Sequence, residues 1–182
     1  LGWDLDAADF GAPAPDNSLA QHAPLEPRSF AQPCWAQEPE RENVRLVATG
    51  DVTVAEVIAD KISVLSSANI ITAPGASLNL SASALRLDAG QAIGTGTDPL
   101  TLSVSELSAL ANTGGIFLSE SDDITVSSVG VTTDKVGADA TTTPIADSAL
   151  SDLQSGSNGS IVLSAGGSIT LDDGDTDGRV VA

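Results

Sequence analysis

The amino-acid sequence predicts an all-β protein, a parallel β-helix (solenoid) in which short strands stack coil upon coil. Two observations support this prediction: an eleven-residue phrase that returns five times, and a core restricted to aliphatic side chains. Apolar residues make up 41% of the chain and aromatic residues only 3%, with no Met or Tyr. A core of Val, Ile, Leu and Ala suits repetitive packing layers.

The repeated phrase has the form strand, turn, strand. Its first, third and ninth positions are aliphatic in every copy, and its middle is small and polar. This alternation predicts strands that turn one apolar side inward. The three inward columns hold Val44, Ile62, Leu85, Ile116 and Ile161, then Leu46, Val64, Leu87, Leu118 and Leu163, then Val52, Ile70, Ile93, Ile124 and Ile169. The second position (Arg45, Ser63, Arg86, Phe117 and Val162) is expected to form a solvated outer face.

Recurrence of the same columns favours a solenoid. One coil alone buries too few aliphatic side chains to offset the entropy of ordering about twenty residues, whereas stacked coils share one apolar column. An antiparallel β-sandwich is the alternative fold, because tight glycine-containing turns also permit it. Sandwich strands, however, need no common register, so the sequence favours the solenoid.

Residues 1–43 differ in composition from the rest of the chain. They hold six of the nine prolines, four of the five aromatic residues, and the only histidine and cysteine. This proline density disfavours helices and central strands, so the segment is predicted to be an irregular linker or leader. A second interpretation is that its Trp and Phe side chains cover the open end of the following core.

Residues 44–182 are predicted to form the solenoid, with two departures. The segment 105–111 is expected to form a short helical turn with Ser105 as its N-cap. The polar, aperiodic segment at about 127–158 is expected to leave the body as an excursion, with a strand near 129–131 and a short helix within 145–153.

Charge and cysteine content exclude several classes of function. The net charge is −18, so nucleic acids and anionic membrane surfaces are not expected partners. No uncharged run is apolar enough to span a bilayer. The single Cys34 excludes an internal disulfide, and its role stays open. The chain is interpreted as an excerpt of a longer polypeptide, so further repeats of that polypeptide are expected neighbours.

The strongest local motif is an acidic turn at Asp173, Asp175 and Asp177, followed by Gly178. Carboxylates at alternate positions can converge on one calcium ion, and the glycine permits a sharp turn. The alternative is an acidic turn between solenoid strands. Calcium is the only cofactor that the sequence suggests.

No catalytic residues are predicted. Residues 44–182 contain no His and no Cys, which removes His-dependent triads and cysteine nucleophiles from the body. The paired Asp122 and Asp123 occupy the turn of the fourth copy, where a turn role is expected. The sequence therefore predicts a protein that is not an enzyme.

The phrases at 115–120 (GIFLSE) and 159–171 (GSIVLSAGGSITL), and the segment 92–100 with its Asp98-Pro99, resemble filamentous-haemagglutinin-like giant bacterial adhesins. Residues 25–28 (LEPR) are similar to a short element near the start of some giant secreted proteins. The resemblance covers residues 44–182. It implies a right-handed parallel β-helix that is secreted or displayed on the bacterial surface.

Three functions follow as hypotheses. The first is a non-enzymatic stalk or passenger segment of a large adhesin, with a glycan or protein on a host or neighbouring cell as partner. The second is a carbohydrate-active β-helix enzyme, which would need converging charged side chains on one face. The third is a calcium-dependent structural spacer.

Overall fold

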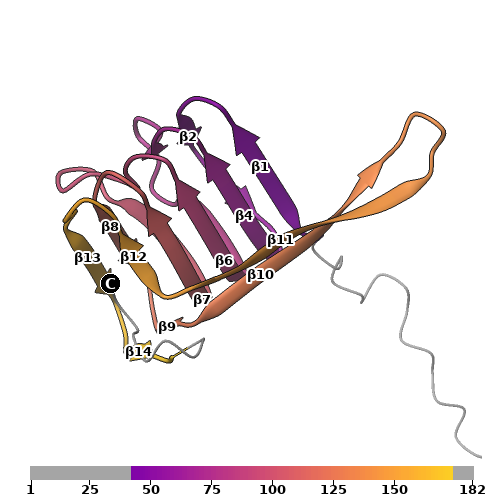
Figure 1. The fold of residues 1–182 in the computed structure, drawn as a ribbon. Helices are drawn as coiled ribbons and strands as arrows, with labels where there is room; N and C mark the ends of the chain where they lie inside the picture. The colour runs from indigo at the N-terminus through magenta and orange to yellow at the C-terminus, as the bar shows by residue number, and fades with distance from the viewer. Residues whose placement is uncertain (1–41, 174–182) are drawn as a thin grey trace, which may run out of the picture. The chain divides into compact units, whose positions relative to one another are not determined.

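The computed structural model describes residues 42–173, and every regular element in this range is a β-strand. Parallel stacked coils form a β-solenoid of about 4 turns (Figure 1). The predicted all-β solenoid is confirmed. The sandwich alternative is wrong, because the strands of successive coils pair in parallel. Residues 1–41, which hold nearly all of the predicted leader, lie outside the described residues.

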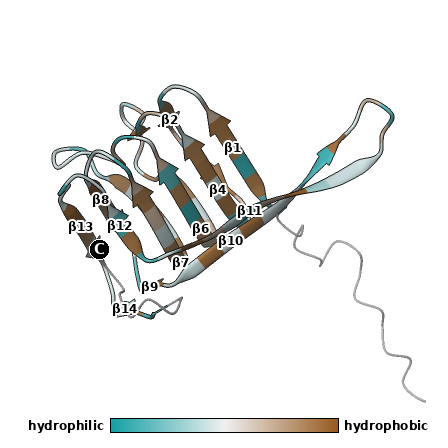
Figure 2. Ribbon diagram, in the orientation of Figure 1, coloured by the Kyte–Doolittle hydropathy of each residue, from teal (hydrophilic) through white to brown (hydrophobic). Residues whose placement is uncertain are grey.

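The strands are short, and most belong to the coils. In chain order they are β1 (Val44–Ala48), β2 (Val52–Val54), β3 (Val57–Ile58), β4 (Lys61–Ser66), β5 (Ile70–Thr72), β6 (Leu80–Ala89), β7 (Leu100–Ala111), β8 (Ile116–Glu120), β9 (Ile124–Val126), β10 (Ser128–Val136), β11 (Thr142–Ser151), β12 (Leu153–Ser155), β13 (Ile161–Ala165) and β14 (Ile169–Leu171). Figure 2 shows apolar residues along the coil strands, whereas the projecting end of the β10–β11 hairpin is largely neutral or hydrophilic.

One sheet of the solenoid, called here the front sheet, consists of β1, β4 and the second halves of β6 and β7. Its first column stacks Val44, Ile62, Leu85 and Leu107, and the last three of these side chains are fully buried. Equivalent positions lie 18, 23 or 22 residues apart. A second column stacks Val52, Ile70, Ile93, Ile116 and Ile161 on the other side of the core.

The register between the third and fourth copies of the phrase differs from the predicted one. Leu85 pairs with Leu107, and Ile116 pairs with Ile93. The copies of the repeated phrase, in contrast, place Leu85 and Ile116 in one column. The predicted helical turn at 105–111 is therefore wrong, because this segment is the second half of β7. Leu107, Ala109 and Ala111 alternate into the core, and pairing with β6 overrides their helix propensity.

The predicted excursion is a β-hairpin inserted into one coil. The strands β10 and β11 pair in antiparallel fashion with an irregularity between Val129 and Val131. The N–H of Asp152 donates to the Ser127 carbonyl across the base of the hairpin at 3.3 Å, so the chain leaves and rejoins the coil at one point. The strand expected near 129–131 is confirmed. The short helix expected within 145–153 is wrong, because β11 and β12 occupy this segment.

Small residues at the coil corners permit the close stacking. A Cβ added to Gly90 would lie 2.2 Å from the Ser67 carbonyl oxygen of the preceding coil. The same clash, at 2.0 Å, would arise between Gly156 and the Asn112 carbonyl. Glycine is therefore a packing requirement at these two corners, because backbone lies directly above backbone there.

Polar side chains, one of them fully buried, connect the coils at their turns. Asn79 is fully buried, donates to the Val54 carbonyl at 2.7 Å and accepts from the Thr101 N–H at 2.8 Å. At another corner, Asn69 donates to Asp51 at 2.9 Å and to Gln91 at 3.0 Å. Each asparagine thus links three successive coils, which satisfies turn groups that the strands leave unpaired.

We predict that Leu107→Ala lowers the free energy of unfolding by about 2–5 kcal/mol, because it opens a cavity in the front column. The neighbouring Glu106→Ala is the matched control, since Glu106 is exposed on the same strand and should change stability by about 0.5 kcal/mol or less. Urea unfolding followed by circular dichroism measures both. Equal effects of the two substitutions would contradict the strand assignment of this segment.

Candidate functional site

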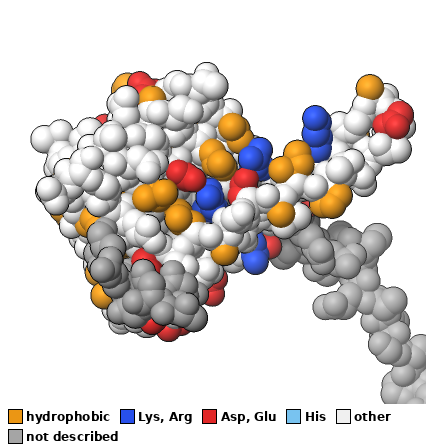
Figure 3. Space-filling model, in the orientation of Figure 1, with side chains coloured by type: hydrophobic (Ala, Val, Ile, Leu, Met, Phe, Trp, Pro, Cys, Tyr) orange, Lys and Arg blue, Asp and Glu red, His pale blue; other side chains and the backbone are white. Residues whose placement is uncertain are grey.

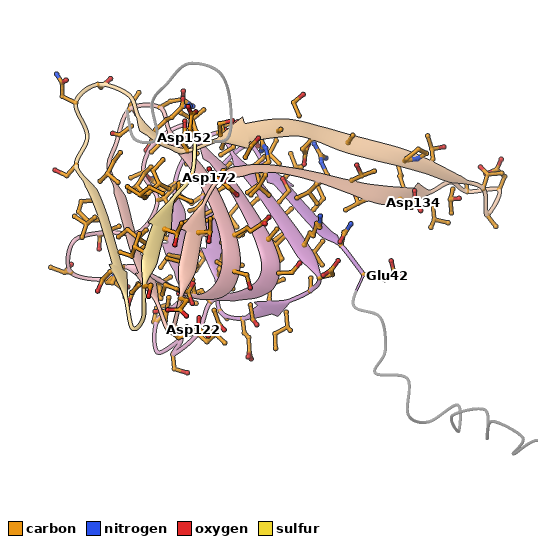
Figure 4. The ribbon with its side chains drawn as sticks, turned by 90° about the horizontal axis from the view of Figure 1, so that it is seen from below. Glu42, Asp122, Asp134, Asp152 and Asp172 are labelled. Carbon is orange, nitrogen blue, oxygen red and sulfur yellow. The ribbon has the colours of Figure 1, made fainter. Side chains whose placement is uncertain are left out.

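The outer face of the front sheet is covered by the β10–β11 hairpin. In Figure 1 the hairpin runs across the ends of the coil strands and projects beyond β1. It contacts β1, β4, β6 and β7, so it lies along the stacking direction. Val129 and Val131 are buried against Ala84 of β6 in a small second core. Figure 4 shows Asp152 near the base of the hairpin and Asp134 on its projecting part.

Two arginines and one asparagine hold the hairpin on the sheet; we call these contacts the latch. Arg45 of β1 donates from Nε to both carboxylate oxygens of Asp147 at 2.8 Å, and its Nη2 lies 2.8 Å from Oδ1. Arg86 of β6 donates from Nε to the Ser148 carbonyl at 3.0 Å. Asn43 donates to the Thr132 carbonyl at 2.8 Å. The latch therefore joins strands more than sixty residues apart in the chain.

The electrostatics of the latch favour the ion pair. Burial by itself would raise the pKa of Asp147, whose side chain is only 6% exposed. The hydrogen bonds from Arg45 and the positive charges of Arg45 and Arg86 outweigh burial, so the pKa of Asp147 is lowered. Hydrogen bonding to Asp147 correspondingly raises the pKa of Arg45. Both partners are thus charged at neutral pH.

The row beneath the hairpin is polar and buried. Ser63, Arg86 and Ser108 stand side by side on β4, β6 and β7, and none is more than 7% exposed. Arg86 also reaches Asp88 with Nη2 at 3.1 Å. The predicted solvated outer face is therefore wrong for Ser63 and Arg86, because the inserted hairpin folds back over them. Val162 pairs with Phe117 and not with the row of Ser63, Arg86 and Ser108, and it is 49% exposed.

A groove of about 440 Å³ lies along the outer face at the far ends of the front strands. Val47 and Leu65 supply apolar surface and Asp88 supplies a carboxylate. Its remaining lining consists of Ala48, Ser66, Ser67, Gly90 and Asn112. Figure 3 shows hydrophobic and charged side chains gathered together on the face that the hairpin crosses. Because Asp88 already pairs with Arg86, the groove can offer apolar contacts and hydrogen bonds.

Glu120 is a buried carboxylate within the solenoid. Glu120 is 4% exposed and accepts hydrogen bonds from the N–H groups of Val104 at 3.1 Å and Ser121 at 2.8 Å. Burial raises the pKa of Glu120 in spite of these bonds. Val104 lies in β7 between residues 100–102, which pair with β8, and residues 106–107, which pair with β9. Glu120 therefore accepts from a backbone N–H at the point where β7 passes from one neighbouring strand to the other.

The predicted site residues have different outcomes. Asp173 is described, but Asp175 and Asp177 lie outside the described residues, so the calcium turn stays a prediction. Within residues 42–173 no group of three His, Cys, Asp or Glu side chains could hold a metal ion. Asp123 accepts from the Ser168 N–H of the next coil at 2.6 Å, which agrees with the turn role expected for it.

Comparisons with known proteins add no relative: no family model, no curated protein and no solved structure matches the chain. The part of the chain described by the structure has no helix that is long and apolar enough to cross a membrane.

Sequence reasoning missed the latch entirely. Its members Arg45 and Asp147 are 102 positions apart, and no local pattern connects them. The only sequence signal was the alternation of Val129 and Val131 within the polar segment, which marks a strand with one apolar side.

We predict that Asp147→Asn loosens the hairpin without unfolding the coils. Hydrogen exchange at the β10 and β11 amides should accelerate about tenfold or more, while the β6 and β7 amides keep their protection. Asp134→Asn, an exposed carboxylate on the same hairpin, is the matched control and should leave exchange unchanged.

The latch should also weaken in acid. Because the pKa of Asp147 lies below its ordinary value of 3.8, its contribution is complete above that pH and is lost as the pH falls through the lower folded value. After correction for intrinsic exchange, protection of the wild-type hairpin amides should fall toward that of the Asp147→Asn variant as the pH is lowered below 3.8 and through the folded pKa of Asp147. A wild-type hairpin equally protected in acid and at neutral pH would contradict this account.

Proposed function

We propose that this chain is a non-enzymatic segment of a secreted or surface-displayed bacterial adhesin, in which the solenoid is a rigid stalk and the hairpin is the binding element. The observation that supports this most strongly is the hairpin itself. It is latched to the outer face by Arg45, Arg86 and Asn43, yet its end projects beyond β1 (Figure 1). A segment held at its base and free at its end suits recognition.

The tip of the hairpin has an ordered shape of its own. The Gly137 N–H donates to the Thr141 carbonyl at 2.7 Å, and the Ala140 N–H donates to the Gly137 carbonyl at 3.1 Å. Asp139 accepts from the Thr141 hydroxyl at 2.7 Å. Val136, beside the turn, is 65% exposed. The tip thus presents one apolar side chain next to hydroxyl and carboxylate groups.

The solenoid supports this role through its stiffness. Its coils share buried aliphatic columns and direct backbone hydrogen bonds, so the stacked coils form a rigid support for the hairpin. The strongly negative chain, at −18, also keeps such a segment soluble outside the cell. The expected target is a glycan or a protein on a host or neighbouring cell.

Replacing tip residues 137–141 by Asn-Gly tests the proposal, because this dipeptide closes a two-residue hairpin turn between Val136 and Thr142. Labelled wild-type chain should be retained on at least one surface in a panel of bacterial cells, epithelial cells and arrayed glycans. The shortened variant should bind that surface about tenfold more weakly or worse.

The control places the same dipeptide at another turn, through Gly75→Asn with Ala76→Gly, and should bind as the wild type does. Binding that survives the loss of the tip would contradict the proposal. Release of sugar from any arrayed polysaccharide would contradict its non-enzymatic part and favour a carbohydrate-active enzyme instead.

A further inference from the structure

Among the described residues, no strand pairs with the outer edge of the first coil, which we call the free edge. In the described residues, β1 pairs only with β4, and β2 pairs only with β5. The Ser67 N–H donates to the Ala48 carbonyl at 3.0 Å, and alternate residues of a parallel strand bond to opposite neighbours. The backbone groups of Val47 therefore point away from β4, along the free edge. Val44, Leu46 and Val52 are only partly buried there, whereas Ile62 and Ile70, next in the same columns, are fully buried.

The hairpin reaches over this same edge. Asn43 and Arg45 hold Thr132 and Asp147 above β1, so the residues beyond them overhang it. Four cross-strand pairs, from Thr133 with Ile145 to Val136 with Thr142, continue the hairpin. At about 3.3 Å per residue this overhang is about 13 Å long, enough to cover two further coils spaced about 4.8 Å apart.

Side chains alternate between the two faces of a strand, which shows which residues form the underside of the overhang. Val131 faces the sheet and is buried, so Thr133 and Lys135 share its side of β10. Their cross-strand partners Ile145 and Thr143 share that side on β11. A two-stranded ribbon alone is marginally stable in water, so a surface under this part would stabilise it.

The last described coil has the complementary features. Ile169 and Leu171 are 44% and 52% exposed, although Ile124 and Val126 beneath them are buried. Leu171 ends the column that begins at Val44, and Ile161 ends the column that begins at Val52. Asp172 places an exposed carboxylate beside this end. If this coil were stacked on the first coil of another copy, apolar columns would meet apolar columns, and the Asp172 carboxylate would lie on the side of Lys135.

We propose that the free edge of β1 and β2, together with the underside of the overhang, is a docking surface for the β13–β14 coil of a second copy of this chain. The stacked coil would continue the parallel sheet, bury the exposed ends of both columns, and lie beneath the hairpin as β4 and β6 do. This contact is head-to-tail, so it generates open chains of copies. It is independent of what the tip binds.

Analytical ultracentrifugation of the full chain tests the proposal across a wide concentration range. The wild type should show a mass that rises with concentration through dimer to larger species. Val47→Pro removes one edge N–H without touching the β1–β4 bonds, and should weaken association about tenfold or more. Hydrogen exchange of the β4 and β6 amides confirms that this variant is folded.

A charge pair gives a test that does not depend on proline. Lys135→Glu should weaken association, whereas Val136→Glu, on the opposite side of the same strand, should not. Asp172→Lys should restore association in the Lys135→Glu background. A monomer at every concentration, a mass that stops at the dimer, or association indifferent to Val47→Pro and Lys135→Glu would overturn the proposal. Retained cell binding by these variants would leave the proposed adhesin function standing.

Discussion

Stacking of one coil on the next is the constraint on which the rest of the structure depends. A single coil has unpaired backbone groups on both edges and an apolar column that only another coil can cover. The effect of position is visible within one column: Leu107, between two coils, is fully buried, and Leu171, in the last described coil, is 52% exposed. The corner glycines and the inter-coil asparagines both follow from this close contact.

The hairpin adds a layer of two strands over the outer face of the front sheet. It is inserted at a point where the coil closes behind it, between Ser127 and Asp152, so the stack continues with little disturbance. Because the hairpin covers this face, a row of polar side chains beneath it is buried. Within this row, Arg86 donates to Ser148 and to Asp88. Arg86 can be buried because the hairpin supplies the Ser148 carbonyl and the sheet supplies Asp88 as acceptors. The outer face is thus an interface within the chain.

The fold class could be predicted from sequence because the core repeats at short range. Aliphatic residues such as Val44, Ile62 and Leu85 recur about once per coil, and this spacing indicates that they stack on one another. The predicted register was wrong at Leu107. The Ser, Leu and Ala residues around it fit a helix as well as a strand, and pairing with β6 decides for the strand. The latch could not be predicted, because Arg45 and Asp147 meet through the path of an inserted hairpin.

The most direct test of this account is a nuclear Overhauser experiment on the backbone protons around Ile93 and Ile116. Parallel pairing of these two residues, together with the pairing of β6 and β7, joins the first three coils to the rest of the stack. The structure predicts strong cross-strand contacts between Ile93 and Ile116, and between Leu85 and Leu107. Contacts between Leu85 and Ile116 in their place would contradict the coil order.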